Sequence, residues 1–128
     1  MDKKLIIVGA ILGMIAIVLG AFGAHALKNV LTVEQLNTFE TGVKYQMYHA
    51  LFLMFVANSQ MITQKIKKTI LILVSLGVLF FSCSIYLLAT NNLTTFDFKI
   101  IGFITPIGGL LLITGWIFVI VNFFNKKS

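Results

Sequence analysis

The side chains that could do chemistry in this chain are two histidines and a few polar groups near them. Tyr45, Gln46 and His49 recur at helical spacing, which places them on one face of a helix. His25 follows a long apolar run, in the stretch Gly20 to Lys28. Two imidazoles on different helices are ligands that a zinc ion or a haem would use.

The other ligands that such a centre needs are missing from the pattern. Zinc takes three or four protein ligands, and the chain has neither an H-x-x-x-H nor a C-x-x-C spacing; Cys83 is its one cysteine. No carboxylate is securely placed beside a base, as acid–base or nucleophilic catalysis would require. We therefore predict no metal, no cofactor and no catalytic residue, in a protein that is not an enzyme.

The composition requires a lipid environment. Hydrophobic residues make up 59% of the 128 residues and charged residues 11%, against about 25% charged in soluble domains. The mean hydropathy is +1.00. The net charge of +6 comes without any arginine, the residue that phosphate recognition favours. The lysines therefore indicate membrane orientation and a lipid bilayer as partner, and no nucleic acid.

Four apolar runs are each long enough for a membrane-spanning helix, which needs about 20 residues. They cover about residues 5–24, 45–62, 70–89 and 100–124. Ala24, His25 and Ala26 resemble a signal-peptide cleavage site, but the run before them is a full span, so we expect this helix to remain uncleaved. The short loops predict a single domain, residues 1–128, that folds as an all-α, up-down four-helix bundle in the membrane.

The lysines also predict the orientation of this bundle. Seven of them share one side if all four runs cross the membrane: Lys3, Lys4, Lys65, Lys67, Lys68, Lys126 and Lys127. Because an excess of lysine marks the cytoplasmic side, both termini are expected in the cytoplasm.

Two segments on the other side look like helix starts. Thr32 and Gln35 form a capping-box pattern, so helix two is expected to begin outside the membrane, about three turns early. Thr94 to Asp97 would open helix four in a similar way. Pro106 removes a hydrogen bond to the Gly102 carbonyl, which predicts a Pro/Gly break in helix four.

Small residues mark faces where helices pack closely. Gly9 and Gly13 form a G-x-x-x-G motif, which lets two membrane helices approach each other. The motif predicts either packing inside the bundle or a contact between copies of the chain. The full set of expected packing positions is Gly9, Gly13, Ala16, Gly20, Gly108, Gly109 and Gly115.

Polar groups are expected to turn inward, because lipid exposure is costly for them. With the orientation above, most of them fall in the outer half of the membrane and predict one pocket open to the outside. Its expected members are His25, Tyr45, Gln46, His49, Ser82, Tyr86, Gly102 and Pro106.

Four stretches resemble the signatures of a known family. In chain order they are "GAFGAHAL", "YQMYHAL", "FSCSIYLLA" and "TPIGGLLLITGW". They are similar to domain-of-unknown-function family 423, relatives of transmembrane protein 256, over nearly the whole chain. The resemblance implies a small four-helix protein of the bacterial inner membrane. It brings no chemistry with it.

Two functions from different classes remain open at this point. The first is a non-enzymatic accessory or assembly protein, which forms a homo-oligomer or joins a larger membrane complex. The alternative is binding or transport of a small molecule, lipid or quinone through an outward-facing polar pocket that contains His25 and His49.

Overall fold

The structure, a computed structural model, describes residues 1–93 and 99–126. Its four long helices are α1 (Asp2–His25), α2 (Val33–Asn58), α3 (Gln64–Ala89) and α4 (Ile104–Phe124). Three short 3-10 helices, η1 (Leu27–Asn29), η2 (Asn91–Leu93) and η3 (Lys99–Phe103), lie between them. Within the described ranges the chain contains no strand, as the apolar runs predict.

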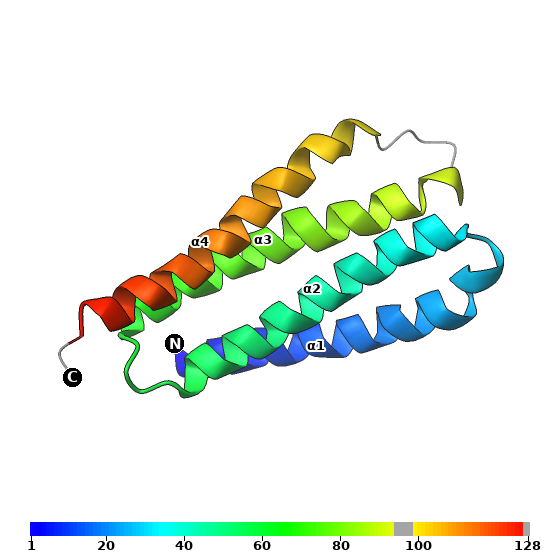
Figure 1. Cartoon of the computed structure of the whole chain (residues 1–128). Coiled ribbons are helices and arrows are strands. Elements are labelled where there is room, and N and C mark those ends of the chain that lie inside the picture. The colour runs from blue at the N-terminus through cyan, green and yellow to red at the C-terminus, as the bar shows by residue number, and fades with distance from the viewer. Residues whose placement is uncertain (94–98, 127–128) are drawn as a thin grey trace.

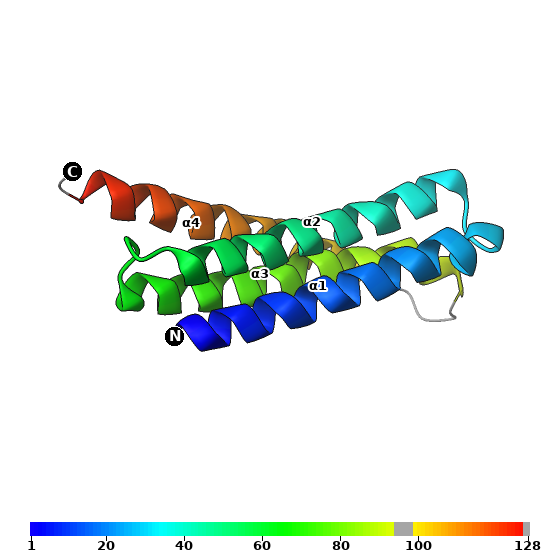
Figure 2. The same cartoon turned by 90° about the horizontal axis from the view of Figure 1, so that it is seen from below.

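The four helices form an up-down bundle. α1 and α3 run in one direction and α2 and α4 in the other (Figure 1), and both the start of α1 and the end of α4 lie at the same end of the molecule (Figure 2). α1 packs on α2, α2 on α3, and α3 on α4. In the described part of the chain, the backbone of α4 approaches neither α1 nor α2 closely. Close backbone packing therefore joins α4 to α3, and its contacts with α2 are made by side chains.

Three helical segments are long and apolar enough to cross a membrane: Asp2–Asn29, Gln64–Ala89 and Ile101–Phe124. The expected spans 5–24 and 70–89 fall inside the first two, and the expected span 100–124 nearly coincides with the third. α2 is not among them, because Lys44, Gln46 and His49 lower its hydropathy. The expected span 45–62 also runs four residues too far, since α2 ends at Asn58 and residues 59–62 lie in the loop before α3. Since α2 connects α1 to α3 along the full length of the bundle (Figure 1), it runs between the same two ends.

Local sequence explains where α2 and α3 begin. Thr32 Oγ1 accepts from the Gln35 amide at 3.1 Å, and Gln35 Oε1 accepts from the Thr32 amide at 2.9 Å. The predicted capping box is thereby confirmed. Thr63 Oγ1 caps α3 in the same way, accepting from the Ile66 amide at 3.3 Å.

The start of α4 differs in detail from the expected break. η3 ends at Phe103, and α4 begins at Ile104, so Pro106 lies in the first turn of the α-helix. An N–H at this position has no partner inside the helix, so proline costs little there. The discontinuity is a change from 3-10 to α-helix, not a kink within an α-helix. The expected start at Thr94 to Asp97 lies outside the described residues.

Glycines set the close helix contacts. A Cβ added at Gly9 would lie 2.8 Å from the Ala50 carbonyl oxygen, and one at Gly13 would lie 3.7 Å from the Ala50 Cβ. The G-x-x-x-G face of α1 is thus occupied by α2 of the same chain. Ala16 is buried on this side of α1, and Gly20 lies close to Val43.

The α3–α4 contact uses glycines in the same way. A Cβ at Gly108 would collide with the backbone of Phe80 and Phe81. One at Gly115 would lie 3.0 Å from Val74 Cγ2, whereas one at Gly109 would meet only the Phe81 ring, at 3.6 Å. Gly108 and Gly115 therefore permit the contact, and Gly109 lies beside it.

Two apolar clusters lie toward opposite ends of the bundle. The larger contains Leu5, Leu53, Val56, Ile70 and Val74. All four helices contribute to it, α4 through Leu112. The smaller contains Leu27, Leu31, Phe39 and Ala89. Polar side chains of α2 and α3 lie between them, and these form the candidate site.

Candidate functional site

The first polar centre is built around His49 of α2, which is only 4% exposed. Its Nδ1 lies 2.7 Å from the Tyr45 carbonyl oxygen, and its Nε2 lies 3.1 Å from Trp116 Nε1 of α4. The indole N–H can only donate and the carbonyl can only accept. His49 therefore accepts at Nε2 and donates from Nδ1, which fixes a neutral ring with both nitrogens in use.

Aromatic rings close the gap that separates the backbones of α2 and α4. Trp116 stacks on Phe52 with ring centroids 4.1 Å apart, and its ring meets His49 edge-on at 6.0 Å. A cavity of about 280 Å³ lies beside this cluster, between α2 and α4 and over α3. Its lining residues are Tyr45, His49, Phe81, Gly109, Leu112, Ile113 and Trp116. The lining is mostly apolar, with the half-exposed Tyr45 at its edge.

The second polar centre is the buried amide of Gln46, on another side of α2. Gln46 Nε2 donates to the Leu12 carbonyl of α1 at 2.8 Å, and Gln46 Oε1 accepts from the Tyr86 hydroxyl of α3 at 2.7 Å. One side chain thus joins three helices. Such interhelical bonds stabilise membrane bundles, typically by about 0.6 to 2 kcal/mol each.

Ser82 and Gly42 bring α2 and α3 together next to this amide. Ser82 is fully buried and donates to the Gly42 carbonyl at 2.9 Å. A Cβ at Gly42 would lie 2.6 Å from Cε1 of Tyr86, so only glycine fits beneath that ring. A second cavity, of about 310 Å³, lies on the side of the Gln46 centre that faces α1 and α3. Its lining residues are Leu12, Ile15, Leu19, Gln46, Ser75, Val78, Leu79, Cys83 and Tyr86.

The structure divides the expected pocket into these two centres and leaves three of its members outside both. His25 is exposed at the end of α1, 13 residues beyond the Leu12 that bonds Gln46, or about 20 Å along the helix. Gly102 has no neighbour within 4 Å of an added Cβ, and Pro106 is exposed. The expectation of one shared pocket containing both histidines is therefore corrected.

A third polar cluster was missed from the sequence. Lys67 is 2% exposed, and its Nζ donates to Asp2 Oδ1 at 2.8 Å and to the Ala57 carbonyl at 3.2 Å. Gln64 adds a bond to the same Asp2 oxygen at 3.1 Å. The cluster ties the first turn of α1, the last turn of α2 and the start of α3 together. Helical spacing puts Lys67 on the face of Ile70, one turn later, but it does not reveal the partner Asp2, which lies 65 positions away.

α4 is tied to the same end of the bundle by Asn122. Its Nδ2 donates to the Met61 carbonyl at 3.0 Å, and the side chain is buried. The polar atoms of all these clusters are satisfied: among the described residues, no buried side-chain nitrogen or oxygen lacks a hydrogen-bond partner. In the same ranges, no three His, Cys, Asp or Glu side chains come together as metal ligands would.

Comparison with known proteins gives the family. Residues 19–109 match the family described as "protein of unknown function (DUF423)". The chain belongs to this family. The match covers Gln46, His49 and Tyr86, whereas Trp116 and Asp2 lie beyond its ends.

Relatives of this DUF423 chain are similar over nearly their whole length. The "UPF0382 membrane protein SSP2132" of Staphylococcus saprophyticus is 40% identical over 123 residues, which cover 96% of this chain and 98% of the relative. The "UPF0382 membrane protein YwdK" of Bacillus subtilis is 39% identical, over 93% of this chain and 94% of the relative. The "UPF0382 inner membrane protein YgdD" of Escherichia coli is 31% identical, over 98% and 93%. No solved structure matches the chain.

Proposed function

We propose that this DUF423 chain is a non-enzymatic membrane protein that acts by assembly, with copies of itself or as an accessory of a larger membrane complex. The observation that carries the proposal is the closed hydrogen bonding of its polar centres. Both nitrogens of His49 and both ends of the Gln46 amide are engaged by groups of the chain itself. These groups hold helices together, and neither ring nitrogen of His49 is free to act as a catalytic base.

One-sided packing of α4 supports the assembly role. Among the long helices as described, α3 is the one whose backbone α4 approaches closely, and the outer face of α4 carries exposed Ile107, Leu110 and Ile117. The G-x-x-x-G face of α1 is already filled by α2. We therefore place the contact with a partner on α4 and not on that face of α1.

We also propose that the protein lies in the cytoplasmic (inner) membrane of a bacterium with both termini in the cytoplasm. The exposed lysines Lys3, Lys4, Lys65, Lys68 and Lys126 support this orientation, since they lie at the end that holds the start of α1 and the end of α4. Lys67 adds little to the exposed charge in the folded state, because it is buried and paired with Asp2.

The alternative function is binding or transport of a small amphipathic molecule, such as a lipid or quinone. The cavity between α2 and α4 favours this alternative, because its volume, about 280 Å³, is close to the lower limit for ligand pockets. Tyr45, at the edge of this cavity, is 40% exposed, and its phenol would be the polar contact for such a ligand.

Native mass spectrometry in mild detergent separates the two functions. The wild type is compared with Tyr45→Phe, which removes the phenol at the edge of the cavity, keeps the backbone carbonyl that His49 bonds, and lies on α2, away from the proposed contact face of α4. For an assembly protein we expect the same defined oligomer or complex from both, and no small-molecule adduct on either. An adduct on the wild type that Tyr45→Phe weakens or loses would favour the ligand-binding function. A bare monomer in both would contradict assembly.

A further inference from the structure

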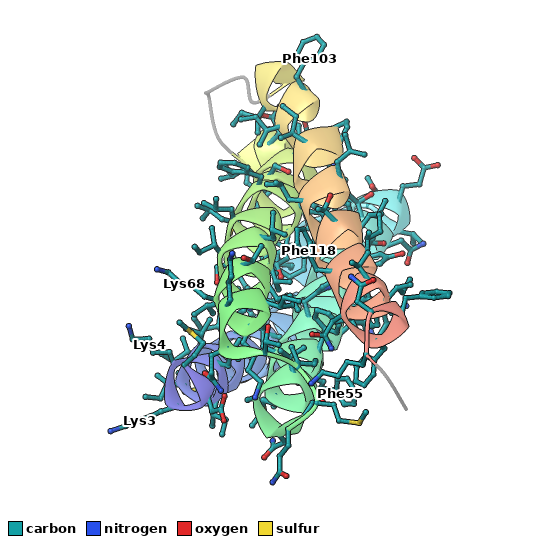
Figure 3. The ribbon with its side chains drawn as sticks, turned by 90° about the vertical axis from the view of Figure 1, so that its left-hand side faces the viewer. Lys3, Lys4, Phe55, Lys68, Phe103 and Phe118 are labelled. Carbon is teal, nitrogen blue, oxygen red and sulfur yellow. The ribbon has the colours of Figure 1, made fainter. Side chains whose placement is uncertain are left out.

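Two exposed lysines project from the same side of one end of the bundle, without an ion-pair partner in the described structure. Lys4 lies in the first turn of α1 and Lys68 in the second turn of α3, and both helices begin at the same end (Figure 1). Figure 3 shows both side chains projecting from the same side of the molecule. Among the described residues, neither makes an ion pair, since the one ion pair there joins Lys67 to Asp2.

No described acid compensates these two charges. Asp2, the acid at this end, is engaged by Lys67 at 2.8 Å and by Gln64 at 3.1 Å. Glu34 lies in the first turn of α2, at the opposite end of the bundle, and Glu40 follows it less than two turns later. Lys4 and Lys68 therefore present a positive site to an anion approaching along the membrane surface.

An apolar cavity begins about two helical turns further along α1 and α3, on the same helix faces as these lysines. On α3, Ser75 and Leu79 follow Lys68 by 7 and 11 residues, a spacing that returns to one face. On α1, Ile15 follows Lys4 by 11 residues and therefore lies on its face too. The cavity of about 310 Å³ between α1 and α3 thus lies directly in line with the basic pair.

The dimensions match one leaflet of a bilayer. At 1.5 Å per residue, the cavity extends from about 11 Å beyond the lysines, at Leu12 and Ser75, to about 23 Å, at Leu19 and Cys83. The distance from the headgroups to the bilayer midplane is about 20–22 Å. A phosphate at the lysines would therefore place the distal part of an acyl chain inside the cavity.

We propose that this face of the protein binds one anionic phospholipid. Its phosphate lies between Lys4 and Lys68, and one of its acyl chains occupies the cavity between α1 and α3. A zwitterionic lipid offers the same chain but brings its own cation, so the basic pair selects for net negative charge. The site is distinct from the His49 centre and from the proposed assembly face on α4.

The test is lipid titration of the full chain in mild detergent, followed by native mass spectrometry. The probes are dioleoylphosphatidylglycerol and dioleoylphosphatidylcholine. We expect one bound phosphatidylglycerol, preferred over phosphatidylcholine. Each lysine near an anionic group contributes about fivefold to affinity, so Lys4→Gln with Lys68→Gln should weaken phosphatidylglycerol by about 25-fold and leave phosphatidylcholine unchanged.

A matched control removes two charges from the same end but away from the cavity. Lys3 and Lys126 are exposed there, and Lys3 projects on the side of Lys4 that faces away from Lys68 (Figure 3). Lys3→Gln with Lys126→Gln should lower phosphatidylglycerol affinity by less than about threefold. An equal loss in both double variants would mean diffuse surface charge and would overturn the proposal, as would an unchanged affinity after the loss of Lys4 and Lys68.

The acyl part of the proposal has its own test. Ser75→Trp fills the cavity and should weaken both lipids alike, with Leu79→Trp as a second variant if the first loses its helical circular dichroism. sn-Glycerol 3-phosphate, which has the phosphate without chains, should bind far more weakly than phosphatidylglycerol. Equal binding of the chainless probe, or full lipid binding by both folded tryptophan variants, would refute occupation of the cavity.

Discussion

Two adjacent glycines at the start of α4 should respond in opposite ways to the same substitution. A Cβ at Gly108 meets backbone atoms only, with the Phe80 carbonyl carbon at 2.7 Å and the Phe81 Cα at 2.9 Å. A Cβ at Gly109 meets the Phe81 ring at 3.6 and 3.8 Å, which is ordinary contact. The Phe81 nitrogen is nearer still, and backbone cannot rotate away as a side chain can, so Gly108→Ala must move α4 from α3 by about 1 Å to restore a separation of 3.4 Å from that atom.

The magnitude follows from two opposing terms. Replacing glycine by alanine within a helix stabilises it by about 0.5–1 kcal/mol, and this term acts at both positions. Overpacking costs about 1–3 kcal/mol and acts only at Gly108. We therefore expect Gly109→Ala to be neutral or slightly stabilising and Gly108→Ala to be destabilising, with a difference of about 1–3 kcal/mol between the two variants.

Trp116 provides the assay, because it is the one tryptophan of the chain and lies on α4 against Phe52. Unfolding in mixed micelles of mild detergent and SDS, followed by its fluorescence, gives the free energy of unfolding for each variant. If the free energies of Gly108→Ala and Gly109→Ala agree within about 0.5 kcal/mol, the close α3–α4 contact described here is wrong.

The polar contacts give three further predictions, each checked by thermal unfolding in detergent with circular dichroism. Tyr86→Phe removes the hydroxyl that donates to the side-chain amide of Gln46 and should lower the free energy of unfolding by about 1–2 kcal/mol. An unchanged unfolding temperature would contradict that hydrogen bond. Trp116→Phe leaves Nε2 of His49 without a donor and should cost about 1–3 kcal/mol, whereas equal stability would mean that the imidazole is solvated. Lys67→Met should lower the free energy of unfolding by about 1–2 kcal/mol. This is less than the loss of one partner from a fully buried ion pair, because Asp2 is half exposed. Lys68→Met, at the exposed neighbouring position, should leave stability unchanged.

The fold was predictable because its signals are local. Apolar run length gave the four helices, and the Thr32–Gln35 capping box lies within four residues. The polar stripe of α2 correctly indicated that Gln46 and His49 turn inward, since both are buried. Helical spacing cannot say which neighbour each side chain meets, and the two residues in fact bond to different helices.

The rest of the site depends on long-range contacts that no local pattern encodes. Trp116 reaches His49 across 67 positions of sequence, so its role could not be deduced from its own surroundings. The position of His25 at the end of an apolar run predicts a place in the pocket, yet the side chain is exposed there. Sequence alone predicts Lys67 as a loop charge because lysine rarely lies in a core, whereas its burial depends on the Ala57 carbonyl and on the carboxylate of Asp2, 65 positions away.

That separation between Asp2 and Lys67 has a consequence for how the protein is made. At about 5–20 residues per second of synthesis, Lys67 emerges from the ribosome about 3–13 s after Asp2. During this interval the Asp2 carboxylate has no lysine of α3 to pair with and stays hydrated at the membrane surface. The lysine likewise enters as a hydrated charge, free to act in the orientation of its helix, and is buried only when α1, α2 and α3 come together. Insertion and final packing therefore use the same side chain in two successive environments.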